Sequence, residues 1–409
     1  MGRSGCREWI LAEVGPLADA HVVLGVTGSI AAYKAADLAS RLVRCGIAVH
    51  VVMTRSATKL VGEATFRAIT GRPVATDMFE LTNPFAIEHV SLAEAADLMV
   101  VAPATANIIA KIATGIADDL LTCTALATTA PLLIAPAMHT AMWENAATRA
   151  NVETLCTRGV CLVGPDEGRL ASGGFGTGRL APVPELLGEI LRILGRDGDL
   201  AGRTIVVTAG GTREAIDPVR FLGNRSSGKM GFALAEAARD RGAEVQLIAG
   251  STSAPLPRGV TIVRALSAAE MLSAVRSSVA QADVLIMAAA VADFVPATVS
   301  DGKIKKHDAG ISIDLERSTD VLTAVDGPAV RVGFAAETDD LLENARRKLQ
   351  SKRLDLVVAN RIGEDVPFGA DTNRAVLIGA NAEEELPLLS KRELADRILD
   401  RVVALLGST

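Results

Sequence analysis

The chain has 409 residues, a length that indicates two or three domains. Its residues are 49% hydrophobic but only 3% aromatic, which is typical of parallel α/β sheets built from Ala, Val, Leu and Ile and excludes a disordered chain, a collagen-like repeat or a coiled coil. The net charge of −6 argues against a general nucleic-acid binder.

The first twenty residues, the cysteines and one long apolar stretch bear on location. The opening residues carry several charges, so they hold no apolar signal-peptide core, and we assign this extension no role. The five cysteines have no CxxC spacing and predict neither a disulfide framework nor a zinc site. Residues 120–143 could span a bilayer, but Pro131 and Pro136 interrupt them, and we interpret them as a helix, a buried strand and a loop. We expect a cytoplasmic protein without a membrane segment.

Two stretches share one plan, an apolar run followed by a helical pattern, a glycine and a second apolar run. Residues 21–54 begin with HVVLGVTG, continue as a helix over 33–44, stop at Gly46 and end with IAVHVVMT. Residues 204–250 repeat the plan with TIVVTAGG, a helix, a stop at Gly242 and AEVQLIAG. Each stretch predicts a strand–helix–strand unit with a right-handed crossover and parallel strands.

Further apolar runs extend both predicted sheets, and a helix ends the chain. The runs span 97–104, 131–137, 283–291, 329–337 and 354–360. The final helix should begin at Ser390, which forms a capping box with Glu393. Its buried face should hold Leu394, Ile398, Val402 and Leu405.

A polar, glycine-rich segment, GRDGDLAG at 195–202, separates the two halves and follows a helix that should end near Leu194. We therefore predict an extension over 1–20, a first domain over 21–195, a linker over 196–202 and a second domain over 203–409. Both domains have a common size.

The turn after the first strand suits a phosphate, because ligands of open α/β sheets bind beyond the carboxyl ends of the strands. Thr27, Gly28 and Ser29 offer close approach, hydroxyls and backbone N–H groups there. A tight turn without a ligand is the alternative. The turn reads GSIAAYK rather than GxGxxG, and the second strand ends in Thr54–Arg55 rather than an acidic residue. A mononucleotide phosphate such as that of FMN therefore fits better than NAD.

A second turn, GNRSSGK at 223–229, matches the first seven positions of a P-loop. Met230 replaces the residue whose hydroxyl binds magnesium, and the preceding strand ends too far upstream, so we reject a Walker A site. Two interpretations stay open: an anion-binding turn at a helix start with Lys229 as a point charge, or a surface loop capped by serines.

Lysines are frequent in the second half. The run at 303–306 reads KIKK and is either a solvated face or part of a polyphosphate pocket. Lys348 and Lys352 are four residues apart and share one helix face, where like charges repel unless an anion binds.

Long motifs recur in a fixed order from His21 to the final helix. The first half contains GSIAAYK (28–34), EHV (88–90), APATAN (102–107) and PAMHTAMW (136–143). The second half contains TAGGTREAIDPVRFLGNRSSGKMG (208–231), AAAVADF (288–294), KIKK (303–306) and GFAAET (333–338), and then the helix with Lys348 and Lys352. Together these motifs resemble those of the bifunctional phosphopantothenoylcysteine decarboxylase/phosphopantothenate–cysteine ligases of coenzyme A biosynthesis.

For the first half the resemblance implies a flavodoxin-like domain that binds FMN. The positions that match the flavin-contacting motifs are Gly28, Ser29, Thr54, Thr105 and Asn107. The implied reaction oxidises the substrate's cysteine thiol with FMN, releases the adjacent carboxylate as CO2 and returns a hydride from reduced FMN.

Three further positions of the first half match the family's catalytic motifs, two of them with a different residue. His89 matches the catalytic histidine, although such a residue taken alone is more often structural. In the PxMNxxMW pattern His139 replaces Asn, and either side chain can donate a hydrogen bond to a carboxylate. Ser172 replaces a reactive cysteine in a loop, and its hydroxyl is a far weaker acid than a thiol, so protonation in the reductive step needs water or another group.

For the second half the resemblance implies a Rossmann-like ligase that uses CTP and Mg2+ to activate a carboxylate as an acyl-cytidylate, which the cysteine amine then attacks. Lys303 matches the lysine of the first step, and Asn224 the residue that acts on the acyl-cytidylate. The positions that match nucleotide contacts are Asp293, Lys303, Asp320, Val321, Phe334, Lys348 and Lys352. Arg225 stands where the family often has His.

The resemblance implies three small-molecule partners, 4′-phosphopantothenate, L-cysteine and CTP. It also implies a homo-oligomer, with trimers through the first domain, dimers through the second and a dodecamer as one assembly. The main alternative is an active ligase whose first domain binds flavin without catalysis. An NAD-dependent reductase is disfavoured by Arg55 and by the missing acidic residue after AEVQLIAG.

Overall fold

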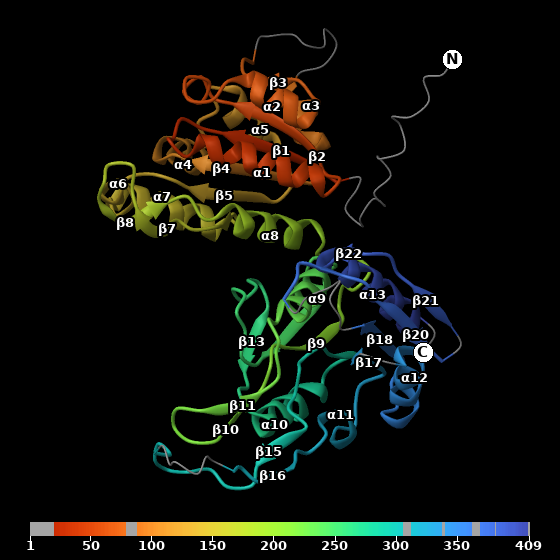
Figure 1. Cartoon of the computed structure of the whole chain (residues 1–409). Helices are drawn as coiled ribbons and strands as arrows, with labels where there is room; N and C mark the ends of the chain where they lie inside the picture. The colour runs from red at the N-terminus through yellow and green to blue at the C-terminus, as the bar shows by residue number, and fades with distance from the viewer. Residues whose placement is uncertain are drawn as a thin grey trace, which may run out of the picture. The chain divides into compact units, whose positions relative to one another are not determined.

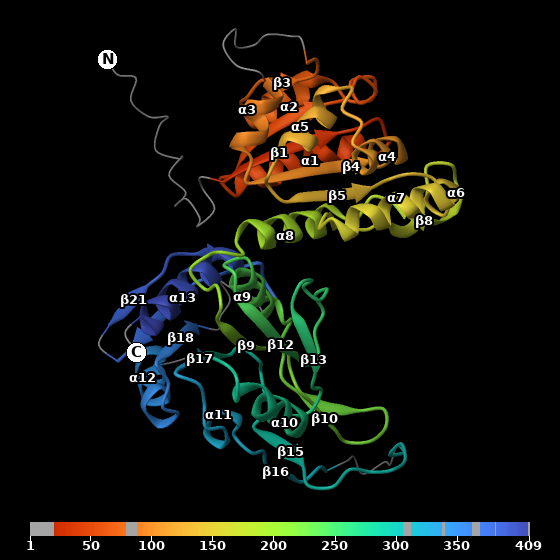
Figure 2. The ribbon, with the colours of Figure 1, turned by 180° about the vertical axis from the view of Figure 1, so that it is seen from behind.

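The computed structural model describes residues 20–78, 88–305, 312–337, 340–361, 369–380 and 382–407. The chain forms two compact units, of which the first ends at Gly195 and the second begins at Arg196. Each unit is built around a sheet of its own, with helices on both faces (Figures 1 and 2).

The first unit contains a six-stranded sheet in the order β3-β2-β1-β4-β5-β6, in which every described pairing is parallel. The strands are β1 (His21–Val26), β2 (Ala48–Met53), β3 (Val74–Ala75), β4 (Leu98–Ala104), β5 (Leu132–Pro136) and β6 (Cys161–Leu162), with β7 (Asp166–Arg169) and β8 (Phe175–Arg179) in a separate hairpin. The helices are α1 (Ala32–Arg44), α2 (Glu63–Thr70), α3 (Glu88–Ala95), α4 (Ala106–Thr114), α5 (Leu120–Ala127), α6 (Thr140–Trp143), α7 (Ala146–Thr157) and α8 (Val183–Leu194).

Alternation along β1 divides the core of this unit into two layers. Leu24 packs with α1 and α8 on one face of the sheet, whereas Val23 packs with α4 and α5 on the other. A strand buried on both faces needs apolar residues at consecutive positions, which is why the first run is apolar throughout.

The second unit contains an eight-stranded sheet in the order β13-β12-β9-β14-β17-β18-β20-β21, parallel up to β18 and antiparallel beyond it. These strands are β9 (Thr204–Ala209), β12 (Glu244–Ala249), β13 (Thr261–Arg264), β14 (Val284–Met287), β17 (Val330–Glu337), β18 (Leu356–Arg361), β20 (Val376–Gly379) and β21 (Glu383–Glu385). The helices are α9 (Lys229–Arg239), α10 (Ala268–Val279), α11 (Val321–Ala324), α12 (Leu341–Ser351) and α13 (Lys391–Leu406). Three short pairings complete the unit: β10 (Arg213–Ala215) with β11 (Phe221–Gly223), β15 (Phe294–Pro296) with β16 (Leu315–Arg317), and β19 (Thr372–Asn373) with β22 (Leu389–Ser390).

Both predicted strand–helix–strand units are present, because β1 pairs with β2 and β9 with β12 in parallel. In the second unit the β10–β11 hairpin stands between β9 and α9, an insertion that the apolar pattern did not indicate. Residues 120–143 form α5 and β5 as expected, but the short helix α6 stands where a loop was predicted. Among the described residues, no helix combines the length and hydropathy needed to cross a bilayer.

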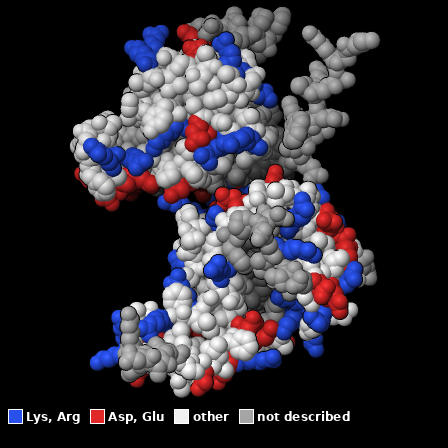
Figure 3. All heavy atoms as spheres, in the orientation of Figure 1, with Lys and Arg blue, Asp and Glu red and all other residues white. Residues whose placement is uncertain are grey.

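The ends of the second unit pack on each other. The expected capping box of Ser390 and Glu393 starts α13, whose Ile398 is fully buried, whereas Leu405, predicted to be buried, is only partly so. Leu200, in the segment expected to be a linker, is fully buried in the same core. Residues 196–202 therefore contribute to the packing of this unit. Acidic and basic side chains are interspersed over the visible face of both units (Figure 3).

Candidate active sites of the two units

Hydrogen bonds join the loops at the carboxyl edge of the first sheet. The Thr27 hydroxyl donates to the Pro103 carbonyl at 2.6 Å and accepts from the Thr105 backbone N–H at 3.2 Å. The Ser29 hydroxyl donates to the Ala137 carbonyl at 3.2 Å. The loops after β1, β4 and β5 are thus held together where ligands of such sheets bind.

The turn after β1 lies so close to the loop after β2 that only glycine fits. A Cβ atom at Gly28 would stand 2.4 Å from the Cβ of Ser56. A close approach at this glycine was predicted for a ligand phosphate. In the structure the group that approaches Gly28 is the loop after β2.

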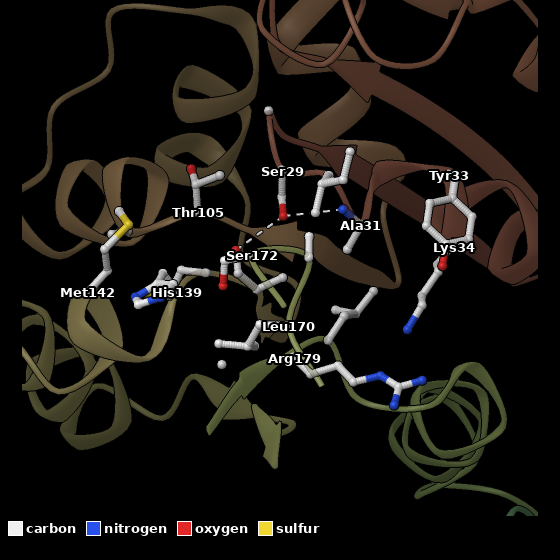
Figure 4. A pocket seen from close by; sticks show the side chains of 18 of the residues that line it. Ser29, Ala31, Tyr33, Lys34, Thr105, His139, Met142, Leu170, Ser172 and Arg179 are labelled. Atoms are coloured by element: carbon white, nitrogen blue, oxygen red, sulfur yellow. Dashed lines mark hydrogen bonds between the residues drawn. The ribbon is translucent and has the colours of Figure 1, made fainter. Parts of the chain in front are cut away.

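Two cavities meet at Gly28 and Thr105. We call the first the flap cavity; its volume is about 800 Å³ and it is lined by Gly28–Ala31, Tyr33, Lys34, Thr105, Ala106, Ala137–His139, Met142, Arg169–Ser172 and Gly178–Leu180 (Figure 4). We call the second the β2 cavity; its volume is also about 800 Å³ and it is lined by Thr27, Gly28, Met53–Ser56, Thr76–Met78, Thr105–Ile108, Lys111, Asp118–Leu121 and Met142. A ligand longer than either cavity can extend through both.

The β7–β8 hairpin covers the flap cavity, and we call it the flap hairpin. Ser172 is exposed in its turn and lines the cavity. The hairpin is fixed to the chain before α6, because the Met138 N–H donates to the Gly178 carbonyl at 2.9 Å. A Cβ atom at Gly178 would stand 2.2 Å from the Met138 oxygen, so this contact requires glycine.

His139 is oriented by the start of α6. Its Nδ1 accepts a hydrogen bond from the Ala141 N–H at 3.2 Å, and it serves as the N-cap of the helix. In the neutral ring Nε2 then carries the proton and is available as a donor. Figure 4 shows His139, Met142 and Ser172 at the same end of the flap cavity.

The predicted residues of the first half are divided by location. Gly28, Ser29, Thr105, His139 and Ser172 line the flap cavity, and Thr54 and Asn107 line the β2 cavity together with Gly28 and Thr105. His89 is partly buried on α3 and is not among the described residues that line either cavity.

Two cations of the flap cavity were not predicted from the motifs. Lys34 lies in the first turn of α1 and Arg179 ends β8. Lys34 belongs to the GSIAAYK motif, so the sequence marked its position, but no role was assigned to it. Arg179 carried no signal, since only the hairpin pairing brings it to the cavity.

In the second unit the turn at 223–229 leads directly into α9. Gly228 has a φ of 80° and precedes Lys229, the first residue of the helix. The Lys229 ammonium donates to an Asp371 carboxylate oxygen at 2.6 Å and to the Gly369 carbonyl at 2.8 Å. This hydrogen bond and charge hold the pKa of Asp371 below its usual value. The predicted point charge is thus paired within the protein.

Two cavities also adjoin in this unit. The turn cavity, about 350 Å³, is lined by Arg225–Gly231, Ala288–Val291, Asp293, Phe334, Ala336, Lys348, Asn360, Arg361, Gly369, Thr372, Asn373 and Lys391. The α11 cavity, about 550 Å³, is lined by Met287, Ala289, Val291–Asp293, Ser318–Leu322, Phe334, Asn344, Arg347, Lys348, Ser351 and Lys352. Asp293, Phe334 and Lys348 line both, so these predicted nucleotide contacts lie between the two spaces.

Lys348 of α12 and Lys352, the residue that caps its carboxyl end, have internal partners. Lys348 donates to the Phe334 carbonyl at 2.7 Å, and Lys352 donates to an Asp320 carboxylate oxygen at 2.6 Å. Burial opposes ionisation of Asp320, but hydrogen bonds from Lys352 and Thr323 outweigh it, so its pKa lies below the usual value. The like charges expected to repel are therefore stabilised without an anion.

Two predicted residues lie outside these linings. The Asn224 amide donates to the Val291 carbonyl at 3.1 Å, which fixes it beside the turn cavity. Lys303 is exposed and is not among the described residues that line either cavity. Lys306 lies outside the described residues. Within the described part of the chain, no three His, Cys, Asp or Glu side chains gather as a metal site.

Comparison with known proteins covers both units. Residues 12–195 match the family described as Flavoprotein, and residues 200–406 match the DNA/pantothenate metabolism flavoprotein C-terminal domain. The chain is 45% identical over 397 residues to the coenzyme A biosynthesis bifunctional protein CoaBC of Bacillus subtilis, covering 95% of this chain and 98% of that protein. It is 47% identical over 407 residues to the protein of the same name from Mycobacterium tuberculosis H37Rv, covering 95% and 97%. A crystal structure of the C-terminal domain of such a protein matches 52% of this chain and all of that chain, with 41% identity and a TM-score of 0.45.

The fold and the family matches define a flavoprotein domain followed by a pantothenate-metabolism C-terminal domain. The near full-length identity goes further, and the chain belongs to the family of bifunctional coenzyme A biosynthesis proteins. The resemblance inferred from the motifs and the predicted α/β fold class are both confirmed.

Proposed function

We propose that the second unit joins cysteine to 4′-phosphopantothenate with CTP, and that the first unit decarboxylates the resulting phosphopantothenoylcysteine with FMN to 4′-phosphopantetheine. The observation that carries this proposal is the pair of adjoining cavities at the loop edge of each sheet, lined by most of the motif residues.

The cavities of the first unit suit FMN. The Thr54 and Thr105 hydroxyls and the Asn107 amide line the two cavities that meet at Gly28, beside Ser29 in the flap cavity. These groups are the donors that a phosphate and a ribityl chain need. When bound, FMN supplies the redox chemistry that makes the carboxylate a leaving group.

The protein's own residues bind and orient the substrate. The Nε2–H of His139 donates to the substrate carboxylate, and its ring is held by the Ala141 N–H. The flap hairpin covers the cavity and limits access of water, and Ser172 contributes a hydroxyl from its turn. A serine hydroxyl is a far weaker acid than a thiol, so Ser172 does not donate its proton as a cysteine would. Water therefore supplies the proton in the reductive step.

His89 requires a second copy of the chain. Because His89 is not among the described residues that line the cavities of its own chain, we propose that a homo-oligomer brings it to the site of a neighbouring copy. Co-expression of His89→Asn chains with His139→Ala chains tests this arrangement. Mixed assemblies should recover part of the CO2 release that neither variant shows alone, whereas no recovery would contradict it.

In the second unit we propose that CTP binds across the α11 cavity and the turn cavity. Asp320, Val321 and Lys352 hold one part of the nucleotide, and Asp293, Phe334 and Lys348 lie between the cavities. Mg2+ typically binds through substrate phosphates and one or two carboxylates, and Asp293 is the available carboxylate between the two spaces. Asn224 acts on the acyl-cytidylate, and Lys303 stabilises charge in its formation.

Purified protein tests the whole proposal. It should be yellow, release FMN on denaturation and make 4′-phosphopantetheine and CO2 from 4′-phosphopantothenate, cysteine and CTP. A colourless protein that consumes no CTP would overturn it.

Ser172 favours a second candidate, in which the first unit binds flavin without catalysis while the ligase is active. Under this hypothesis phosphopantothenoylcysteine accumulates and no CO2 appears, although the protein is yellow. The His89→Asn variant separates the two candidates. Loss of CO2 release with flavin retained supports catalysis by the first unit, whereas cells that are unaffected by the substitution support a first unit that binds flavin without catalysis.

A further inference from the structure

One end of the flap cavity carries two cations that the reaction described above does not use. Lys34 enters from α1 and Arg179 from the end of β8. In Figure 4 their charged groups point toward one another, at the opposite end of the cavity from His139 and Ser172. The cavity thus has two polar ends, each built by a different part of the chain.

These two cations are incompletely neutralised. In the described part of the chain neither forms an ion pair, and the carboxylate whose charge acts on Lys34 is that of Asp166, the cross-strand neighbour of Arg179. Burial and then the charge of Arg179 lower the pKa of Lys34, and Asp166 only partly opposes them. Two converging cations with one weak counter-charge form a site for an anion.

Apolar side chains also line the cavity. Ile30, Leu170 and Leu180 line the cavity, and Leu180 is almost fully buried. A ligand that fits is therefore elongated, with an anionic group at each end and a less polar middle. The proposed decarboxylase substrate has this form, since it carries the reacting carboxylate at one end and a phosphate monoester at the other.

We propose that Lys34 and Arg179 bind the terminal phosphate of the decarboxylase substrate and thereby set its direction in the cavity, with its carboxylate toward His139. This inference rests on the proposed function of the first unit. A phosphate monoester dianion matches the two positive charges, and Arg179 can hold two of its oxygens at once.

The test compares phosphopantothenoylcysteine with pantothenoylcysteine, which lacks the phosphate. In the unaltered protein kcat/KM should be higher for the phosphorylated substrate. Lys34→Gln and Arg179→Gln should each lower kcat/KM for it by about 10- to 100-fold, the range expected for one charge-assisted hydrogen bond, mainly through KM. For pantothenoylcysteine kcat/KM should stay unchanged, and Lys34→Arg should recover most of the discrimination.

Arg169→Gln is the matched control. Arg169 lines the same cavity from the same hairpin. In the strand register it lies opposite Phe175, next to the turn, whereas Arg179 lies opposite Asp166 at the other end of the hairpin. Its loss should leave the ratio of kcat/KM between the two substrates unchanged. An equal fall in that ratio for Arg169→Gln would indicate a general charge effect and overturn the assignment.

Flavin content separates this inference from the proposed function. If Lys34→Gln protein loses FMN absorbance, the pair holds the cofactor phosphate and the inference is wrong. If the variants keep the preference for the phosphorylated substrate, the inference is wrong while the decarboxylase stands. If the unaltered protein decarboxylates neither substrate, the proposed function itself fails, and the inference with it.

Discussion

The cations around the two sets of cavities differ in what they contact. In the second unit Lys229 pairs with Asp371 and Lys352 with Asp320, at 2.6 Å each. In the flap cavity of the first unit Lys34 and Arg179 lie at the same end, without such a partner among the described residues (Figure 4). A ligand of the second unit therefore meets lysines that already pair with carboxylates, whereas a ligand of the flap cavity meets two cations without such a pair. The β2 cavity resembles the second unit in this respect, because its Lys111 pairs with Asp118 at 2.6 Å.

This difference suits the two ligands proposed. A nucleotide triphosphate brings several charges together with a metal ion, so it can replace one internal carboxylate and still gain contacts. The decarboxylase substrate brings one phosphate, and it binds best where no internal pair competes for the cations. Four predictions test the comparison between the units.

The largest effect should come from the separate cores. Ile398 is fully buried in the second unit, so Ile398→Ala should lower the free energy of unfolding of that unit by about 2–5 kcal/mol. Trp143 lies in the first unit and is nearly buried, so in a Trp9→Phe background, which leaves it the one tryptophan of the sequence, its fluorescence reports unfolding of the first unit. Denaturant titration is followed by ligase activity and by Trp143 fluorescence. For Ile398→Ala, ligase activity should be lost at a lower denaturant concentration, whereas the transition seen by Trp143 fluorescence should not move.

Leu38→Ala is the matched change, because Leu38 is fully buried in the core of the first unit. Leu38→Ala should move the transition seen by Trp143 fluorescence to a lower denaturant concentration. The denaturant concentration at which ligase activity is lost should not change. A common shift of both probes by either variant would contradict independent cores.

The next effect concerns the two glycine turns. Gly28→Ala places a Cβ 2.4 Å from Ser56 Cβ, and Gly228→Ala puts one 2.6 Å from Thr252 at a φ of 80°. The first variant should lose flavin and lower CO2 release by about 100-fold, or ~2.7 kcal/mol, with ligase activity kept. The Gly228→Ala variant should lower ligase activity by a similar factor, with flavin and CO2 release from phosphopantothenoylcysteine kept.

Gly62→Ala is the control, since no atom lies within 4 Å of the Cβ it would add. It should keep both activities and the flavin absorbance. Equal loss in all three variants would show that alanine disturbs the fold rather than the turn.

A smaller effect is expected when one internal pair of the second unit is broken. Lys352→Gln should raise KM for CTP by about tenfold, because one charge-assisted contact to the nucleotide is lost. Arg346→Gln removes a cation from the same helix whose partner is Glu383 on β21, and it should leave KM for CTP unchanged. Steady-state kinetics at two salt concentrations distinguishes the two, and an equal rise in both variants would contradict a local role for Lys352.

The sequence predicted the fold well because apolar periodicity reports burial. The runs at 97–104 and 283–291 contain β4 and β14, and the capping box at Ser390 begins α13. The β10–β11 hairpin was missed because its strands are short and partly exposed, so burial left no pattern to detect.

The candidate sites were predicted only in part, because long-range pairing positions side chains that no local motif marks. Arg179 reaches the flap cavity through its pairing with Asp166, and Lys229 meets Asp371 across 142 positions of sequence. His89 was assigned by resemblance, and a single chain does not bring it to the cavity lining described above.

The smallest predicted effect is a pH dependence confined to the first unit, at two stacked histidines. His21 and His50 begin and centre the neighbouring strands β1 and β2, with ring centroids 5.3 Å apart and Nδ1 of His21 3.1 Å from Nε2 of His50. Burial, then the charge of Arg72, then His21 lower the pKa of His50. Below about pH 6.5 the unfolded chain therefore binds a proton that the folded chain excludes. The stability of this unit should be constant above that pH and fall as the pH decreases toward the lower folded-state pKa.

The expected fall is about 1–3 °C in the thermal midpoint between pH 7.5 and 5.5, followed by Trp143 fluorescence. His50→Gln removes the titrating ring and should flatten the profile, and Arg72→Gln should reduce the slope because it removes the second-largest cause of the shift. A slope unchanged in both variants would assign the pH dependence to other groups of the unit.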